Sequence, residues 1–133
     1  MSRTFFCRSV NFTAGHHYSK PGADAAENKK LFGDAVTPHD HHWQLTVWLE
    51  GGLDENGMMV DLGQVDEVLR QEVTGRFHNQ HINAVDAFFQ QHQPTNEVLA
   101  NYFAERLAKR FAPVKLAKLR IAEAPDLFAE WLP

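Results

Sequence analysis

In the stretch from residue 39 to residue 50, one kind of side chain occupies the odd positions and another the even positions, and the first two odd positions are histidines. Its odd positions carry two imidazoles and then large apolar groups: His39, His41, Trp43, Leu45, Val47 and Leu49. Such alternation predicts a β-strand. On a strand, His39 and His41 point the same way, roughly 6.6 Å apart, so both can reach one metal ion. Two hydrogen-bonded histidines at a sheet margin are the alternative interpretation.

A third histidine is brought to this pair by the first strand that the sequence predicts. Alternation over 3–13 indicates a strand that ends near His16, and residues 23–32 then form an irregular or partly helical excursion. If the two strands form an antiparallel hairpin, His16 comes near His39 and His41. Three imidazoles with a fourth coordination position left open are typical of a catalytic zinc site.

Two amphipathic helices follow, and each has a start signal. Asp61 is expected to cap a helix that runs to about Thr74, with Gly75 just beyond its end. Thr95 is expected to cap the second helix, and Glu97 in its first turn favours the helix dipole.

The end of the chain predicts two more strands. In the first, over 114–124, the apolar parity changes between Leu116 and Leu119, which indicates a bulge, and the second covers 127–132. The order β-β-α-α-β-β predicts one α+β domain over residues 1–133, an antiparallel sheet with two helices on one face. Four strands leave exposed edges, so we expect copies to associate edge to edge.

Composition narrows the classes of protein and partner. The 133 residues are 44% apolar and 23% charged, which is ordinary for a soluble globular domain. A net charge of −4 without a basic block indicates no nucleic-acid partner and no anionic membrane. No apolar run reaches membrane-spanning length, and no leader is visible. The single cysteine excludes an intrachain disulfide and fits a cytoplasmic location.

Five short motifs occur in a fixed order. They are 12–16 (Phe-Thr-Ala-Gly-His), 38–43 (Pro-His-Asp-His-His-Trp), 57–62 (Gly-Met-Met-Val-Asp-Leu), 94–100 (Pro-Thr-Asn-Glu-Val-Leu-Ala) and 120–125 (Arg-Ile-Ala-Glu-Ala-Pro). Together they resemble the motifs of the 6-pyruvoyl-tetrahydropterin synthase and 6-carboxy-tetrahydropterin synthase family, and five motifs in order are far more specific than one. The resemblance implies the tunnelling fold (T-fold), in which three subunits close a twelve-stranded barrel, two barrels stack into a hexamer, and active sites lie between subunits.

The resemblance also implies roles for named residues. Glu123 would anchor a pterin ring, and Thr95 and Glu97 of the fourth motif would belong to the substrate site. The implied ligands of Zn²⁺ are His16, His39 and His41.

Several positions depart from the family pattern. Ala35 stands where the family has a catalytic cysteine, and His78 and Asn79 replace its Asp-His pair. Alanine carries no proton, and asparagine has no basic nitrogen near neutral pH. His78 is expected to serve as the replacement base, with His81 as a second candidate, because an unperturbed imidazole titrates near pH 6.5. Solvated loop histidines are the alternative for both.

The sequence therefore predicts a zinc-dependent, pterin-binding, lyase-type enzyme that acts on a dihydroneopterin-like substrate with altered acid–base residues. We expect it to form a homo-oligomer, a trimer or a hexamer. The alternatives are a non-catalytic pterin-binding protein and a structural T-fold oligomer with an empty site.

Overall fold

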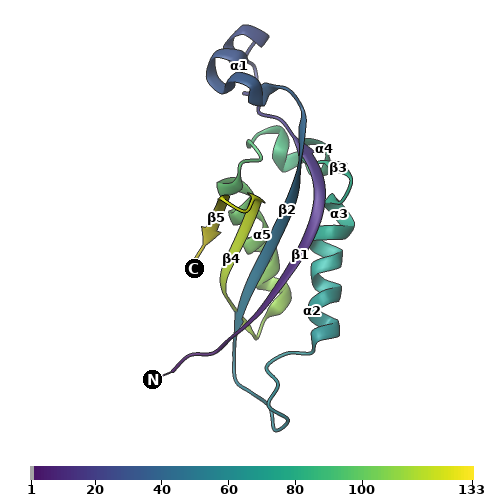
Figure 1. Ribbon diagram of the computed structural model, residues 1–133, viewed down its shortest axis with the longest axis vertical. Helices are drawn as coiled ribbons and strands as arrows, with labels where there is room; N and C mark the ends of the chain where they lie inside the picture. The colour runs from purple at the N-terminus through teal and green to yellow at the C-terminus, as the bar shows by residue number, and fades with distance from the viewer. Residues whose placement is uncertain (1) are drawn as a thin grey trace.

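A long hairpin of two strands, β1 (Phe5–His16) and β2 (His39–Glu50), forms the centre of the sheet in the computed structural model, which describes residues 2–133 (Figure 1). The five strands lie in the order β3-β1-β2-β4-β5. The other three are β3 (Gln80–His81), β4 (Lys115–Ala124) and β5 (Leu127–Trp131). All neighbouring strands are antiparallel except β3, which runs parallel to β1. The predicted α+β class is confirmed, but the sheet has five strands rather than four.

The register of the hairpin decides which side chains meet. β1 pairs with β2 along its whole length, from Phe5 opposite Glu50 to His16 opposite His39. Because side chains alternate across a strand, His16, His39 and His41 all project from the same side of the sheet. The predicted hairpin and its histidine pairing are confirmed.

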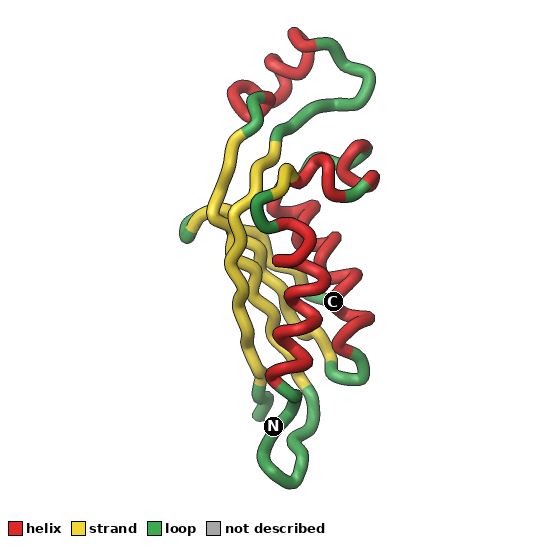
Figure 2. The backbone as a smooth tube through the Cα atoms, turned by 90° about the vertical axis from the view of Figure 1, so that its right-hand side faces the viewer, coloured by secondary structure: helices red, strands yellow, loops and turns green. Residues whose placement is uncertain are grey.

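Helices cover one side of the sheet (Figure 2). α2 (Leu62–Leu69) continues through the π-helical turn η2 (Arg70–Thr74) into α3 (Gly75–Phe77), so the helix passes the end predicted near Thr74. A Cβ atom on Gly75 would lie 2.6 Å from the carbonyl oxygen of Arg70. Gly75 is therefore part of the widened turn rather than the stop signal that the sequence suggested.

The second covering helix is α5 (Asn96–Phe111). The predicted caps are confirmed, since the side chain of Asp61 accepts from the Gln64 amide and that of Thr95 accepts from the Val98 amide. The remaining helical segments are short: α1 (Ala25–Phe32), η1 (Gly33–Val36), α4 (Ile82–Val85) and η3 (Ala87–Gln90). Within residues 2–133, no helix combines the length and the apolar character needed to cross a membrane.

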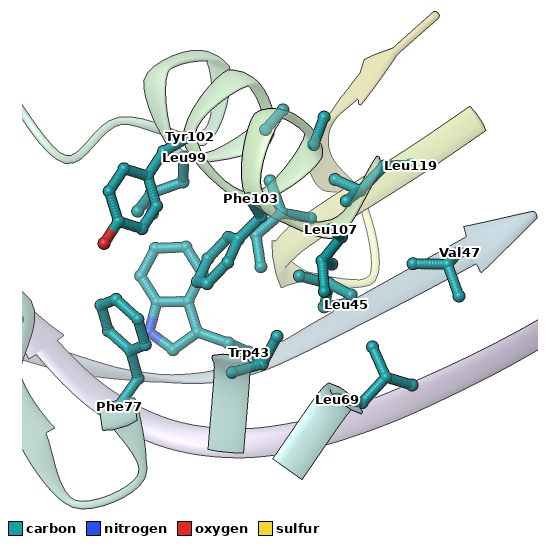
Figure 3. Close-up of a cluster of buried hydrophobic side chains, with 14 of the residues drawn as sticks. Trp43, Leu45, Val47, Leu69, Phe77, Leu99, Tyr102, Phe103, Leu107 and Leu119 are labelled. Carbon is teal, nitrogen blue, oxygen red and sulfur yellow. The ribbon is translucent and has the colours of Figure 1, made fainter. Parts of the chain in front are cut away.

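The core lies between the sheet and its helices (Figure 3). Its largest fully buried side chains include Trp43, Phe77, Phe103, Leu45, Leu49, Leu69, Leu99, Leu107 and Leu119. The Trp43 indole donates to the Ala14 carbonyl at 2.9 Å, and its ring packs edge-on against those of His16 and His41. The histidines therefore sit directly on the end of the core.

The predicted bulge is confirmed in β4. Trp48 pairs with Lys118, whereas the next residue of β2 pairs with Leu116, so Ala117 is the extra residue. The bulge lets both Leu116 and Leu119 point into the core, which explains the change of apolar parity in the sequence.

Candidate metal and ligand site

Three histidines converge where the β1–β2 hairpin opens. The ring centroids are 4.5 Å apart for His16 and His39, 5.1 Å for His16 and His41, and 5.0 Å for His39 and His41. One nitrogen from each ring lies within 4.8 Å of the other two. The structure thus brings together the three ligands that the sequence predicted.

Backbone carbonyls orient two of these rings. Nδ1 of His16 lies 2.8 Å from the Pro94 carbonyl oxygen, and Nδ1 of His39 lies 2.8 Å from the Thr37 carbonyl oxygen. Because a carbonyl can only accept, each Nδ1 carries the proton, and each Nε2 keeps its lone pair. Among the described residues, the buried Nε2 atoms of His16 and His41 have no hydrogen-bond partner. Converging, unpartnered imidazole nitrogens fit a bound metal ion such as zinc.

The electrostatics favour the neutral form that a metal requires. Burial, with smaller contributions from His39 and His41, lowers the pKa of His16 to about 4. Burial also lowers the pKa of His41, although the charge of Glu123 opposes this shift. Both rings are therefore neutral near pH 7, and neutral imidazole is the metal-binding form.

Glu123, near the end of β4, places its carboxylate against this cluster. Its Oε2 lies 2.8 Å from Nε2 of His41 and 3.8 Å from Nε2 of His16. No hydrogen bond joins Nε2 of His41 to this oxygen, and the contact is electrostatic: the charge of Glu123 raises the pKa of His41, against the larger effect of burial. The other oxygen, Oε1, accepts from Nδ2 of Asn96 at 2.6 Å. The predicted ring anchor and the predicted ligands thus share one site.

The start of α5 borders the same site. The Thr95 hydroxyl is occupied in capping α5, whereas Glu97 is exposed in its first turn. Burial and the charges of Glu123 and Glu97 raise the pKa of Tyr18 to about 12, and the Tyr18 ring packs edge-on against His16. Tyr18 and Asn96 belong to the site although sequence reasoning missed them, because neither residue type suggests a ligand by itself.

One backbone hydrogen bond links Ala35 to the segment that follows β1. The Tyr18 amide donates to the Ala35 carbonyl at 2.9 Å, and Tyr18 lies two residues along the chain from the proposed ligand His16. The side chain at the position that the resemblance assigned to a catalytic cysteine is only a methyl group.

His78 lies just before β3 and contacts the outer edge of β1 at Thr13. Its side chain is exposed, and its Nδ1 accepts from the Thr13 amide at 3.1 Å. A neutral His78 in this contact carries its proton on Nε2, so it can donate there but has no free lone pair.

His81, the second candidate base, lies beside the end of β1. It pairs with Gly15 through β3, and its Nε2 is 2.7 Å from Nδ1 of His17. Burial, followed by the charges of His81 and His39, lowers the pKa of His17. The backbone of His17 is held in turn by the buried Asn83, whose side chain bonds both its amide and its carbonyl.

A long antiparallel hairpin, helices on one side and three converging histidines match one family of proteins. The family model described as 6-pyruvoyl tetrahydropterin synthase matches residues 6–132, and the chain belongs to this family. The structure of the Caenorhabditis elegans 6-pyruvoyl tetrahydropterin synthase is similar, with a TM-score of 0.89 and 26% identity, and the match covers 100% of this chain and 97% of that one. The expected T-fold is thereby confirmed.

Curated relatives that carry the name 6-pyruvoyl tetrahydrobiopterin synthase include a human and a slime-mould protein. The human protein is 28% identical over 123 residues, which cover 90% of this chain and 84% of that protein. The Dictyostelium discoideum protein is 27% identical over 84 residues, 62% of each chain, so that match spans less than two thirds of its length.

Proposed function

We propose that this protein is a zinc-dependent, pterin-binding, lyase-type enzyme that acts on a dihydroneopterin-like substrate. The observation that carries the proposal is the pairing of three converging histidine nitrogens with the carboxylate of Glu123 in one site. The names of the relatives support a tetrahydropterin synthase type of chemistry.

His16, His39 and His41 would hold the metal through one nitrogen each. Three imidazoles suit zinc, and three protein ligands leave a position for substrate. Bound zinc would act as a Lewis acid that polarises an oxygen of the substrate side chain. The chain prepares this site by burying the rings in their neutral form and by fixing two Nδ1 protons on carbonyls.

Glu123 would anchor the pterin ring. A carboxylate can accept from the 2-amino group and the neighbouring ring N–H together, which selects this edge of the heterocycle. Glu97 would face the ligand from the first turn of α5. Thr95 would act indirectly, because its hydroxyl caps the helix that carries Asn96 and Glu97.

We propose His78 as the residue that exchanges protons with substrate. Its bond from the Thr13 amide favours a donor role through Nε2, and a role as base would require that bond to break. His81, coupled to His17, is the second candidate. Ala35 can take no part in proton transfer.

We further propose that residues 1–133 form one T-fold domain that assembles as a homo-oligomer in multiples of three. β5 lies at one end of the strand order and keeps Leu127 and Phe128 53% and 43% exposed. An exposed apolar edge strand favours pairing with another copy. We also propose a cytoplasmic location, consistent with the free Cys7.

The second candidate function is a pterin-binding protein without turnover. The loss of proton-carrying groups at Ala35 and Asn79 favours it. Incubating the zinc-loaded protein with dihydroneopterin triphosphate and identifying the products by mass spectrometry separates the two functions. If the protein is an enzyme, a new pterin product should form with the wild type and be absent with His78→Ala. Unchanged substrate in every sample would support binding without turnover.

A further inference from the structure

We propose that Asn96 is a positioning residue that fixes the carboxylate of Glu123 and thereby makes the site selective for heterocycles that carry an amino group next to a ring N–H. This inference rests on the proposed pterin-binding function. Asn96 lies between Thr95 and Glu97 in the motif over 94–100, and neither the sequence pattern nor the family resemblance gave it a role.

The contact between the two side chains links two separate elements. Nδ2 of Asn96, the first residue of α5, donates to Oε1 of Glu123, near the end of β4, at 2.6 Å. Asn96 is 5% exposed, and the side chain of Glu123 is 10% exposed. A short hydrogen bond to a charged acceptor in such a sheltered place defines the plane of the carboxylate.

The side-chain oxygen of Asn96 supports a functional role for the hydrogen bond from its nitrogen to Glu123. Among the described residues, its buried Oδ1 has no hydrogen-bond partner. A buried acceptor without a partner destabilises a fold, so an apolar residue of similar size would serve the packing better. Asn96 destabilises the fold through this oxygen and lies beside the proposed ligand-binding carboxylate. These two facts favour a functional role for Asn96 over a structural one.

A fixed carboxylate selects its ligand by chemistry. Each oxygen of Glu123 has lone pairs beyond those used within the chain, but it offers acceptors only. Two adjacent donors, an amino group and a ring N–H, complement this pair of oxygens. A ring with a carbonyl in place of the amino group sets acceptor against acceptor, and a carboxylate held in one plane cannot turn away from it.

The variants Asn96→Ala and Asn96→Asp test the role of the amide in zinc-loaded protein. Neopterin and its 2-oxo counterpart, a lumazine with the same side chain, serve as probes. Asn101→Ala is the matched control, because Asn101 lies on the same helix, is exposed, and within residues 2–133 its side chain bonds only the Glu97 carbonyl. Calorimetry gives the two affinities, and thermal unfolding and metal analysis report on the fold and the zinc.

We expect Asn96→Ala to bind neopterin about 2- to 12-fold more weakly, the typical cost of immobilising one free side chain on binding. The preference for neopterin over the 2-oxo compound should fall, while the zinc content and the unfolding temperature do not. Asn96→Asp should lose more affinity, because its carboxylate faces Oε1 of Glu123.

A lower unfolding temperature with unchanged selectivity would show that Asn96 is structural and would overturn this inference alone. Wild-type protein that binds neither probe would overturn both the inference and the proposed function. Asn101→Ala should match the wild type in all four measurements, and a similar loss of selectivity in this control would also refute a specific role for Asn96.

Discussion

Burial of His16 predicts that the metal-free protein loses stability as the pH falls from about 6.5 to about 4. His16 is 0% exposed, and burial lowers its pKa from the usual value of about 6.5 to about 4. Between these values the unfolded chain binds the proton and the folded chain does not, so acid favours unfolding. At pH 4.5 the linkage amounts to about 2.5 kcal/mol relative to pH 7.5. This free energy is a large part of the total free energy of unfolding of an ordinary domain, which is about 5–15 kcal/mol.

Urea unfolding of the metal-free protein at pH 7.5 and pH 4.5 measures this effect. The free energy of unfolding that is lost between pH 7.5 and pH 4.5 should be smaller by about 2.5 kcal/mol in His16→Gln, because glutamine takes up no proton. His92→Gln removes an exposed histidine that stacks on Phe88, and it should retain the wild-type difference. If the wild type and His16→Gln lost the same free energy of unfolding between pH 7.5 and pH 4.5, protonation of His16 would not be the cause of the acid sensitivity. A proton NMR titration of folded wild type provides a second check, since a midpoint for His16 near 6.5 would refute it independently.

The remaining predictions concern metal, assembly, activity and the helix turn. His39→Ala and His41→Ala should each lose the roughly one zinc per subunit expected for the wild type, and full zinc in both would reject this ligand set. Light scattering should give the mass of three or six subunits. A monomer at micromolar concentration would contradict this prediction. The protein should show little 6-pyruvoyl-tetrahydropterin synthase activity, since one lost acid or base typically costs about 10²–10⁴ in rate. An ordinary synthase rate would contradict the roles assigned to Ala35 and His78. Gly75→Ala should lower the free energy of unfolding by about 1–3 kcal/mol in urea titrations, because its Cβ would meet the Arg70 carbonyl, and unchanged stability would show that the turn relaxes.

The parts of the fold that have a strong sequence period could be predicted. Alternation over 39–50 predicted β2, and an antiparallel hairpin predicted that His16 lies near His39 and His41, which the register of β1 and β2 confirms. The caps at Asp61 and Thr95 followed from local hydrogen-bonding chemistry. Each of these features depends on residues close together in sequence or on one simple pairing.

Features that depend on tertiary context could not be predicted. β3 is two residues long, too short for any period, and it forms only because it meets the edge of β1. Gly75 was predicted to follow the end of the helix, because glycine is common at that position. The π-helical turn before it could not be seen in the hydrophobic pattern. Asn96 and Tyr18 join the site through contacts with Glu123 and His16, which are distant in sequence.

Calorimetric titration of neopterin into zinc-loaded wild type and Glu123→Gln tests the proposed binding site, with Glu105→Gln on the exposed side of α5 as the control. We expect neopterin to bind to the wild type and to the control. In Glu123→Gln we expect binding to be weaker by about 1.5–3 kcal/mol, the usual contribution of hydrogen bonds to a charged group, with the zinc content unchanged. Equal affinity in all three proteins would contradict the central claim that this carboxylate, set beside the three histidines, is where the heterocycle binds.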